Sequence, residues 1–205
     1  MHLRINDVTV SPARVDELGD VLSNKALPVV QNQKGNRGLL CAADRSTGNC
    51  AIVSLWDSKD ALDASEQAIT SIRSETVDAV AAQLNSIQLA EVLREVRVSP
   101  SQVGTRTRVV RLTAPAGSAD QLVDFYETVA VPRLESQPGF LNGRFIRDVE
   151  QDGRFAAVSH WTDAAALESS EKNSTALRDE VAKAVAGTSI EQVSTSEIIL
   201  IEHET

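Results

Sequence analysis

The pattern of apolar and polar residues predicts eight strands and four amphipathic helices, in an order that occurs twice along the chain. Alternation with a period of two, or a short apolar run, is typical of strands, and apolar residues three or four positions apart are typical of helices. The predicted strands cover residues 3–10, 38–43, 50–56, 89–98, 108–113, 140–149, 155–161 and 193–202. The predicted helices cover residues 12–29, 58–80, 118–134 and 163–185.

Local signals indicate where the first helix of each half begins and ends. Ser11 is expected to cap the first helix, with Pro12 in its first turn. Pro28 lies near the end of this helix and is expected to kink or stop it, because proline lacks an N–H group. Ser118 is expected to cap the corresponding helix of the second half.

The two halves are also related in sequence. Residues 50–80 match residues 155–185 at an offset of 105, with 13 identities in 31 pairs, and Trp56 aligns with Trp161. Upstream pairs align at an offset of 104, and the second strands return to 105. The pairs in the second strands are Gly38 with Gly143 and Leu40 with Phe145. We therefore predict two copies, residues 1–101 and 102–205, with a linker at 99–104.

Each copy follows the order β-α-β-β-α-β, which is the ferredoxin-like arrangement of the α+β class. Two helices cover one face of such a sheet and leave the other face bare. The sequence therefore predicts two tandem ferredoxin-like repeats that form an intramolecular dimeric α+β barrel. In this prediction the chain is a pseudo-dimer by itself, and a further homodimer stays open.

Composition and charge narrow the classes of partner. The net charge is −9 and the cations are scattered, so the chain lacks the clustered positive charge that nucleic-acid binding needs. No stretch approaches the roughly 20 apolar residues that span a bilayer, and residues 1–10 do not resemble a signal peptide. We therefore expect a cytoplasmic protein with no nucleic-acid partner and no membrane partner.

The two cysteines are expected to be buried free thiols. A hairpin turn at residues 45–48 would place Cys41 and Cys50 diagonally on neighbouring strands. Diagonal positions lie roughly 7–8 Å apart, which is too far for an easy disulfide. The chain holds three histidines and two cysteines, so no metal site is predicted.

Both copies contain a strand that ends in Trp, followed by a polar helix start and then Ala-Leu. The segments are Ser54-Leu-Trp56 before residues 57–62 and Ser159-His-Trp161 before residues 162–167. The stretch from Pro132 to Gln137-Pro-Gly139-Phe140 leads from a helix end into the next strand. These features resemble antibiotic-biosynthesis-monooxygenase domains over nearly the whole chain, twice. The family is similar to cofactor-independent quinone-forming monooxygenases, to haem-degrading enzymes and to members without an established activity.

The resemblance implies a test for haem. Haem-degrading members use an Asn on the first strand, a Trp on the third strand and a His further along the chain. Asn6 and Trp56 correspond to the first two, but Glu66 and, in the second copy, Glu171 stand where the histidine would be. A carboxylate is a poor substitute for an axial imidazole. No cofactor is therefore predicted.

The second copy holds most of the candidates for a catalytic site. Tyr126 and Trp161 are predicted to hold a phenolic substrate whose anion reacts directly with oxygen, and His160 is a candidate for proton transfer. The candidate substrate-binding residues are Asn6, Trp56, Arg144 and Phe145. Each candidate also has a purely structural interpretation, as a packed aromatic ring or a hydrogen-bonded core residue. The helix charges Arg73, Arg178, Glu66 and Glu171 are expected to be solvated.

Two functions of different classes follow. The first is a cofactor-independent monooxygenase that acts on a small hydrophobic, aromatic or polyketide-like molecule. The second is a non-catalytic or ligand-binding barrel of this family, and haem binding is a weaker third. The copies differ at candidate pocket positions such as Asn6 against Val110 and Leu22 against Tyr126, so at most one working pocket is expected, and the second copy is favoured.

Overall fold

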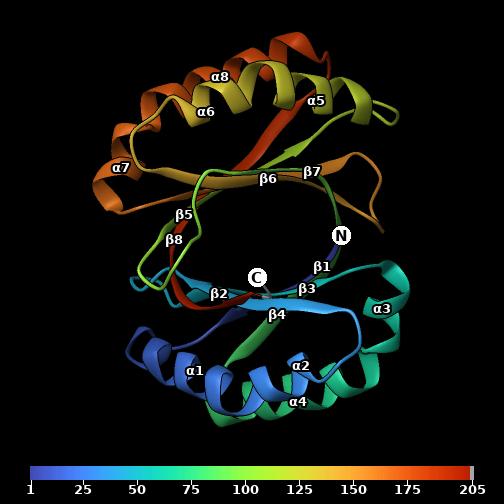
Figure 1. Cartoon of the computed structure of the whole chain (residues 1–205), viewed down its shortest axis with the longest axis vertical. Helices are drawn as coiled ribbons and strands as arrows, with labels where there is room; N and C mark the ends of the chain where they lie inside the picture. The colour runs from blue at the N-terminus through green and yellow to red at the C-terminus, as the bar shows by residue number, and fades with distance from the viewer. Residues whose placement is uncertain (204–205) are drawn as a thin grey trace. The chain divides into compact units, whose positions relative to one another are not determined.

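The computed structural model describes residues 1–203 and has the predicted α+β architecture (Figure 1). Its contacts divide the chain into two compact units. Unit 1 consists of residues 1–90 together with the residues from Ser196 onward, and unit 2 consists of residues 91–195. Both units contain the element order β-α-β-β-α-β.

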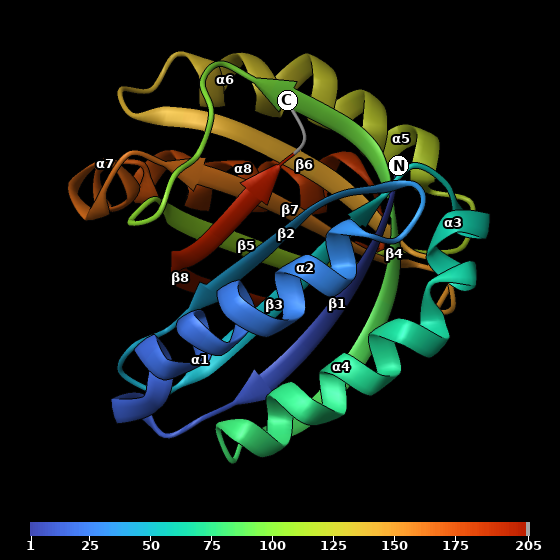
Figure 2. The same ribbon diagram turned by 60° about the horizontal axis from the view of Figure 1, so that its bottom comes forward.

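In unit 1, helices cover one face of an antiparallel sheet, and Figure 2 shows α1, α2 and α4 over this face. The strands are β1 (His2–Thr9), β2 (Asn36–Ala43) and β3 (Asn49–Trp56), flanked by β4 (Gln83–Arg97) and β8 (Ser189–His203). The helical elements are η1 (Pro12–Arg14), α1 (Val15–Val21), η2 (Leu22–Ala26), α2 (Leu27–Gln31), α3 (Lys59–Ala64) and α4 (Glu66–Ala79).

Unit 2 repeats this arrangement, with α5, α6 and α8 over one face of its sheet (Figure 1). Its strands are β5 (Arg106–Thr113), β6 (Phe140–Asp148) and β7 (Arg154–Trp161), again flanked by β4 and β8. Its helical elements are α5 (Ala119–Phe125), η3 (Tyr126–Ala130), α6 (Val131–Glu135), α7 (Ala164–Ser169) and α8 (Glu171–Ala184).

The long strands β4 and β8 belong to both sheets. The first part of β4 and the last part of β8 lie in unit 1, and their other parts lie in unit 2. The hydrogen-bonded order β1-β3-β2-β8-β5-β7-β6-β4 therefore closes on itself, which confirms the predicted barrel topology. The predicted limits 1–101 and 102–205 describe the sequence repeat and stay a prediction.

Each unit has its own apolar core between its sheet and its helices, because each amphipathic helix buries its apolar stripe there. In unit 1, Val15 and Leu18 of α1 are fully buried against the sheet. In unit 2, Leu122 of α5 takes the same role. Among the described residues, no helix is long and apolar enough to cross a membrane.

The first helix of each unit continues past its proline instead of stopping there. Pro28 lies in α2, which runs on to Gln31, and a π-helical turn precedes it at η2. The widened turn pairs the N–H of Leu27 with the carbonyl of Leu22, five residues earlier. Such a turn shifts the hydrogen-bond ladder where proline cannot donate. The same turn, η3, precedes Pro132 in unit 2.

The predicted capping residues have different outcomes. Ser11 and Ser118 occupy N-cap positions, but neither side chain makes a capping hydrogen bond. Ser58 caps α3 by accepting from the N–H of Ala61, and Asp163 caps α7 in the same way. Each predicted second helix is also divided into two, at Ser65 in unit 1 and at Ser170 in unit 2.

The strand register corrects part of the sequence alignment. Leu39 pairs with Ser54, and Gly143 pairs with Ser159, so Gly143 takes the place of Leu39 and not of Gly38. By the same register, Phe145 takes the place of Cys41 and not of Leu40. The predicted alignment is therefore one residue out of register in β2 and β6. Cys41 pairs with Ile52, diagonal to Cys50, and both thiols are buried and free as expected.

Candidate functional site

A buried arginine stands in the middle of the first strand of each unit. Arg4 on β1 is 0% exposed and Arg108 on β5 is 3% exposed. Their guanidinium carbons lie 5.7 Å from the ring centre of Trp56 and 6.0 Å from that of Trp161, respectively, which allows a cation–π attraction. A guanidinium keeps its charge in proteins, so its burial requires hydrogen bonds and a counter-charge.

In unit 2, the break between α7 and α8 supplies the hydrogen-bond acceptors for Arg108. Its Nη1 donates to Oγ of Ser170 at 2.7 Å, and its Nη2 donates to the carbonyl oxygen of Leu167 at 2.8 Å. The last carbonyls of a helix lack partners within the helix. The buried guanidinium therefore satisfies the end of α7 and fixes this helix against the sheet.

Unit 1 repeats the arrangement around Arg4. Its Nη1 donates to Oγ of Ser65 at 3.1 Å, and its Nη2 donates to the carbonyl oxygen of Leu62 at 2.8 Å. Ser65 itself donates to the same carbonyl at 2.6 Å. The identity of Ser65 and Ser170 between the halves thus has a structural reason.

A glutamate links each buried arginine to a second arginine on the long helix. Glu171 accepts from Arg108 at 2.8 Å and, through its other oxygen, from Arg178 at 2.7 Å. Arg178 also donates to Oγ of Ser174 at 2.7 Å. Its side chain is 17% exposed, so the expectation of a solvated charge is wrong for this residue. Positions seven apart lie on one face of a helix, which turns Arg178 towards the buried cluster.

In unit 1, the ion pair between the glutamate and the helix arginine is longer. Glu66 accepts from Arg4 at 2.6 Å, but its contact with Arg73 is 3.4 Å long. The side chain of Arg73 is 11% exposed, so it too is not the solvated charge that was expected.

Each cluster holds two guanidinium groups and one carboxylate, and therefore carries net positive charge beside an apolar core. The hydrogen bond from Arg178 holds the pKa of Glu171 below its ordinary value. Burial lowers the pKa of Arg108, and the charge of Glu171 opposes this. The pKa shifts have the same directions for Glu66 and Arg4 in unit 1. A positive cluster in a low-dielectric place favours an anionic ligand.

In unit 2, a pocket opens between the sheet and the helices, next to this cluster. Its empty volume is about 700 Å³ with its open mouth included. The walls are mostly apolar side chains from α5, α8 and the sheet. The polar and aromatic residues at the pocket are Arg108, Phe125, Tyr126, Phe145, Ser159, Ser174 and Arg178.

Tyr126 lines this pocket with a hydroxyl that has no partner in the described part of the chain. Its side chain is 4% exposed. Burial raises the pKa of the phenol above its ordinary value, so the group stays protonated and acts as a donor. Gly143 makes room for it, because a Cβ at Gly143 would lie 2.9 Å from the Tyr126 oxygen. A buried donor without an acceptor is costly, and an acceptor on a ligand would remove the cost.

Tyr126 begins a row of stacked aromatic rings, of which Phe145 also lines the pocket and Phe155 lies behind it. The ring of Tyr126 stacks on that of Phe145 with centres 5.3 Å apart and planes at 21°. Phe145 stacks in turn on Phe155 at 5.7 Å and 3°. Stacked rings offer a flat apolar surface, which suits a planar ligand.

The two tryptophans lie under the clusters and do not line the pockets. Trp161 is fully buried, and its indole N–H donates to Oγ of Ser159 at 3.0 Å. Trp56 makes the same bond to Ser54 at 2.9 Å. Each tryptophan thereby orients a serine that does line a pocket, and the serine keeps its own proton to donate.

Arg144 and His160 lie on the opposite face of the unit 2 sheet from this pocket. Arg144 follows Gly143 and precedes Phe145 on β6, and successive strand residues face opposite sides. It is paired with Glu95 at 2.8 Å. His160 is buried and shares a hydrogen bond of 2.8 Å with Ser101. The structure therefore brings Tyr126 and Phe145 together but does not add Arg144, His160 or Trp161 to their pocket.

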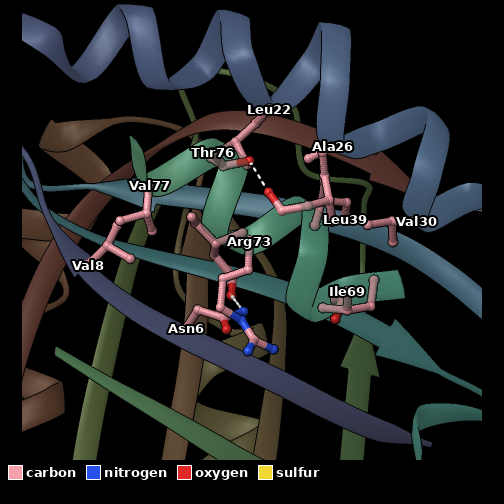
Figure 3. Close-up of a pocket in the computed structure, with 13 residues that line it drawn as sticks. Asn6, Val8, Leu22, Ala26, Val30, Leu39, Ile69, Arg73, Thr76 and Val77 are labelled. Atoms are coloured by element: carbon pink, nitrogen blue, oxygen red, sulfur yellow. Dashed lines mark hydrogen bonds between the residues drawn. The ribbon is translucent and has the colours of Figure 1, made fainter. Parts of the chain in front are cut away.

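A second pocket lies between the sheet and the helices of unit 1 (Figure 3). Its empty volume is about 460 Å³, again with its mouth included. Asn6 reaches into it from β1, and Arg73 reaches into it from α4. The structure gives the positions of Asn6, Tyr126 and the other candidates, and the roles predicted for them stay predictions.

The arginine clusters were not predicted, although the sequence held a signal for them. Arg4 and Arg108 align at an offset of 104, in the middle of otherwise apolar strands. A charged residue at a buried strand position is rare unless it is paired. The roles of Ser174 and Gly143, by contrast, could not be predicted from the sequence, because they depend on the contacts of these residues with Arg178 and Tyr126.

Haem does not fit either cluster. Glu66 and Glu171, at the position of the expected iron ligand, are each held by two arginines. Neither glutamate lines the pocket of its unit. A carboxylate neutralised in this way is a poor ligand for iron. Over the described residues, no group of three or more His, Cys, Asp or Glu side chains is placed to hold a metal ion.

Known proteins share both sequence and fold with this chain. The uncharacterized protein Rv2557 of Mycobacterium tuberculosis is 25% identical over 152 residues, which are 74% of this chain and 67% of that protein. The chain thus spans about two thirds of the length of this relative.

Solved structures resemble the chain over nearly its whole length. A proposed monooxygenase from Fusobacterium nucleatum superposes with a TM-score of 0.69 at 13% identity, covering 99% of this chain and 94% of that one. An anthrone oxidase-like protein superposes with a TM-score of 0.65 at 14% identity, covering 98% and 93%. These similarities show a monooxygenase-like fold. Residues 105–186 match the family model described as antibiotic biosynthesis monooxygenase.

Proposed function

We propose that unit 2 is a cofactor-independent monooxygenase that oxidises an aromatic or polyketide-like small molecule in its pocket. One observation carries this proposal: the unpartnered hydroxyl of Tyr126 and the positive pair Arg108 and Arg178 line the same apolar pocket. Such a pocket suits a planar molecule that becomes an anion. The fold shared with an anthrone oxidase-like protein supports a tricyclic phenol or its keto form as the first substrate to test.

The positive charge of the pocket supports the first step, which is loss of a proton from the substrate. A nearby cation stabilises an enolate or phenolate and so lowers the pKa of the bound substrate. The described residues that line the pocket include no carboxylate and no imidazole. The proton therefore leaves to water at the open mouth, while Arg178 stabilises the anion and Tyr126 donates a hydrogen bond to its oxygen.

The redox step uses dioxygen as the oxidant. The substrate carbanion forms a C–O bond with dioxygen, which gives a peroxide anion on the ring carbon. Protonation gives the hydroperoxide, which then loses water as its O–O bond breaks and the remaining C–H electrons form a C=O bond. One CH₂ group and one dioxygen thus give one C=O group and one water, with no external reductant.

Anthrone and an oxygen electrode test the proposal. We expect one dioxygen to be consumed for each quinone formed, without added cofactor. Tyr126→Phe is expected to lower kcat by about 10²-fold, the effect of removing one donor to a developing anion. Arg178→Met is expected to raise KM. Arg133→Met removes a cation that pairs with Glu180 outside the pocket, and is expected to leave both constants unchanged.

The same experiment separates catalysis from ligand binding. The absence of a lining base favours the second function, a barrel that binds its ligand without reaction. Saturable binding of anthrone without oxygen uptake would establish that function and end the proposal of an oxygenase. Turnover that survives Tyr126→Phe unchanged would place the reaction elsewhere.

A further inference from the structure

The pocket of unit 1 holds two buried polar atoms that have no hydrogen-bond partner among the described residues. Asn6 is 6% exposed, and its Nδ2 donates to the carbonyl oxygen of Ile52 at 3.3 Å. This bond fixes the amide, and its Oδ1 stays buried with no donor. The Nε–H of Arg73 is likewise buried with no acceptor. Both residues line the pocket.

These two atoms define which groups a ligand of this pocket would have to carry. Oδ1 of Asn6 needs a donor, and Nε of Arg73 needs an acceptor. The cluster of Arg4, Arg73 and Glu66 adds net positive charge, so the acceptor is favoured as an anion. Apart from the hydroxyls of Ser54 and Thr76, the remaining walls, which include Val8, Leu22 and Val30, are apolar (Figure 3).

The second unit lacks this pair of requirements. Val110 on β5 takes the place of Asn6 in the pocket of unit 2, as the strand register shows. That pocket presents a tyrosine hydroxyl instead. A ligand chosen by Asn6 would therefore bind in unit 1 and be disfavoured in unit 2.

We propose that the pocket of unit 1 is a second ligand site, which takes a small apolar hydroxycarboxylate. The carboxylate accepts from Arg73, the neighbouring hydroxyl donates to Asn6, and the apolar body packs against the aliphatic walls. The inference concerns a different pocket from the proposed oxygenase, so a failure to oxidise anthrone leaves it untouched.

Salicylate is the probe, and calorimetric titration is the measurement. Benzoate keeps the carboxylate but lacks the hydroxyl, and 2-methoxybenzoate keeps the oxygen but cannot donate. We expect saturable binding of one salicylate per chain and about tenfold weaker binding of both analogues, since one buried hydrogen bond is lost. Equal binding of salicylate and 2-methoxybenzoate would overturn the proposal.

Variants of Asn6 and Tyr126 show in which of the two pockets salicylate binds. Asn6→Val copies unit 2 and is expected to raise the melting temperature, because it removes an unpaired buried acceptor, and to abolish the preference for salicylate. Asn6→Asp keeps the size and the acceptor but repels the carboxylate, and is expected to abolish binding. Loss of binding in Tyr126→Phe would place salicylate in unit 2 and contradict the assignment, as would unchanged binding in both Asn6 variants.

Discussion

The two units build the same framework and line it differently. In both, a buried arginine, a serine at a helix break, a glutamate and a tryptophan join the sheet to the second helix. The pocket walls beside this framework differ at most positions. Differing pairs in which at least one residue lines a pocket include, unit 1 first, Asn6 and Val110, Leu22 and Tyr126, Leu39 and Gly143, Cys41 and Phe145, Ile52 and Ala157, and Ile69 and Ser174.

This difference separates what holds the fold from what recognises a ligand. The framework is shared because each unit has to bury the same helix against the same sheet. The walls have changed towards aliphatic side chains and an amide in unit 1, and towards a phenol and stacked rings in unit 2. The pocket of unit 2 is also the larger, at about 700 Å³ against about 460 Å³.

The tryptophans are expected to give the largest effect. Trp56→Ala and Trp161→Ala should each lower the free energy of unfolding by about 3–5 kcal/mol, because each leaves a large cavity. Trp161 also meets Phe140 edge-on at 5.5 Å, where Asn36 stands in unit 1. Its loss should therefore cost about 1 kcal/mol more, by urea unfolding. Equal costs would show that the edge contact contributes nothing.

The serines at the helix breaks test whether the framework is equivalent in the two units. Ser65→Ala and Ser170→Ala each remove an acceptor from a buried guanidinium. The expected loss is about 1.5–3 kcal/mol in each unit, the range for hydrogen bonds to charged groups. Urea unfolding of both variants measures it. If only one of the two variants lowered the free energy of unfolding, the two frameworks would contribute differently to stability despite their similar geometry.

Gly143 and Tyr126 are expected to be coupled. Gly143→Ala places a Cβ 2.9 Å from the tyrosine oxygen, and the overpacking should cost about 1–3 kcal/mol. In the Tyr126→Phe background the oxygen is gone, so the cost should fall. A double-mutant cycle measures the coupling energy. Leu39→Ala in unit 1 is the matched control, since its effect should be independent of Tyr126.

Acid is expected to give the smallest difference. The pKa of Glu171 is lowered in the folded state, so its contribution is present above its unfolded pKa of about 4.3 and is lost as the pH falls through the folded value. Glu171→Gln should weaken the dependence of stability on pH below this point. Glu66→Gln should weaken it less, because the contact of Glu66 with Arg73 is longer. Thermal unfolding between pH 3 and pH 7, roughly the window set by these pKa values, tests the order.

Much of the fold could be predicted from local patterns. Strand alternation located all eight strands of the described residues, but β4 and β8 begin earlier than predicted, at Gln83 and Ser189. The division of the second helix at Ser65 was missed, because serine is compatible with a helix and the break is fixed by the bond from Arg4. The π-helical turns were also not predicted. A proline shows that one backbone hydrogen bond of the helix is lost, but it does not show whether the helix stops, kinks or widens there.

The candidate site was predictable only in part. Tyr126 and Phe145 were expected and do share a pocket, but the aligned position of Phe145 was one residue out. Both units have a bulge at the equivalent place in this strand, and the difference of one residue arises in the following hairpin, where six residues separate the paired Ala43 and Cys50 and seven separate Arg147 and Phe155. Arg144 was named as a candidate together with Phe145, although the two are neighbours on β6 and neighbouring strand residues face opposite sides of the sheet.

The sequence by itself determined the order of elements, the relation between the halves and the tryptophans that end each third strand. These depend on neighbours along the chain, where spacing is enough. Only the tertiary structure decided that Arg108 is buried, that Gly143 makes room for the hydroxyl of Tyr126, and that Asn6 keeps an unpaired oxygen. Those facts depend on which atoms meet across strands and helices, and such meetings are set by register and packing rather than by spacing along the chain.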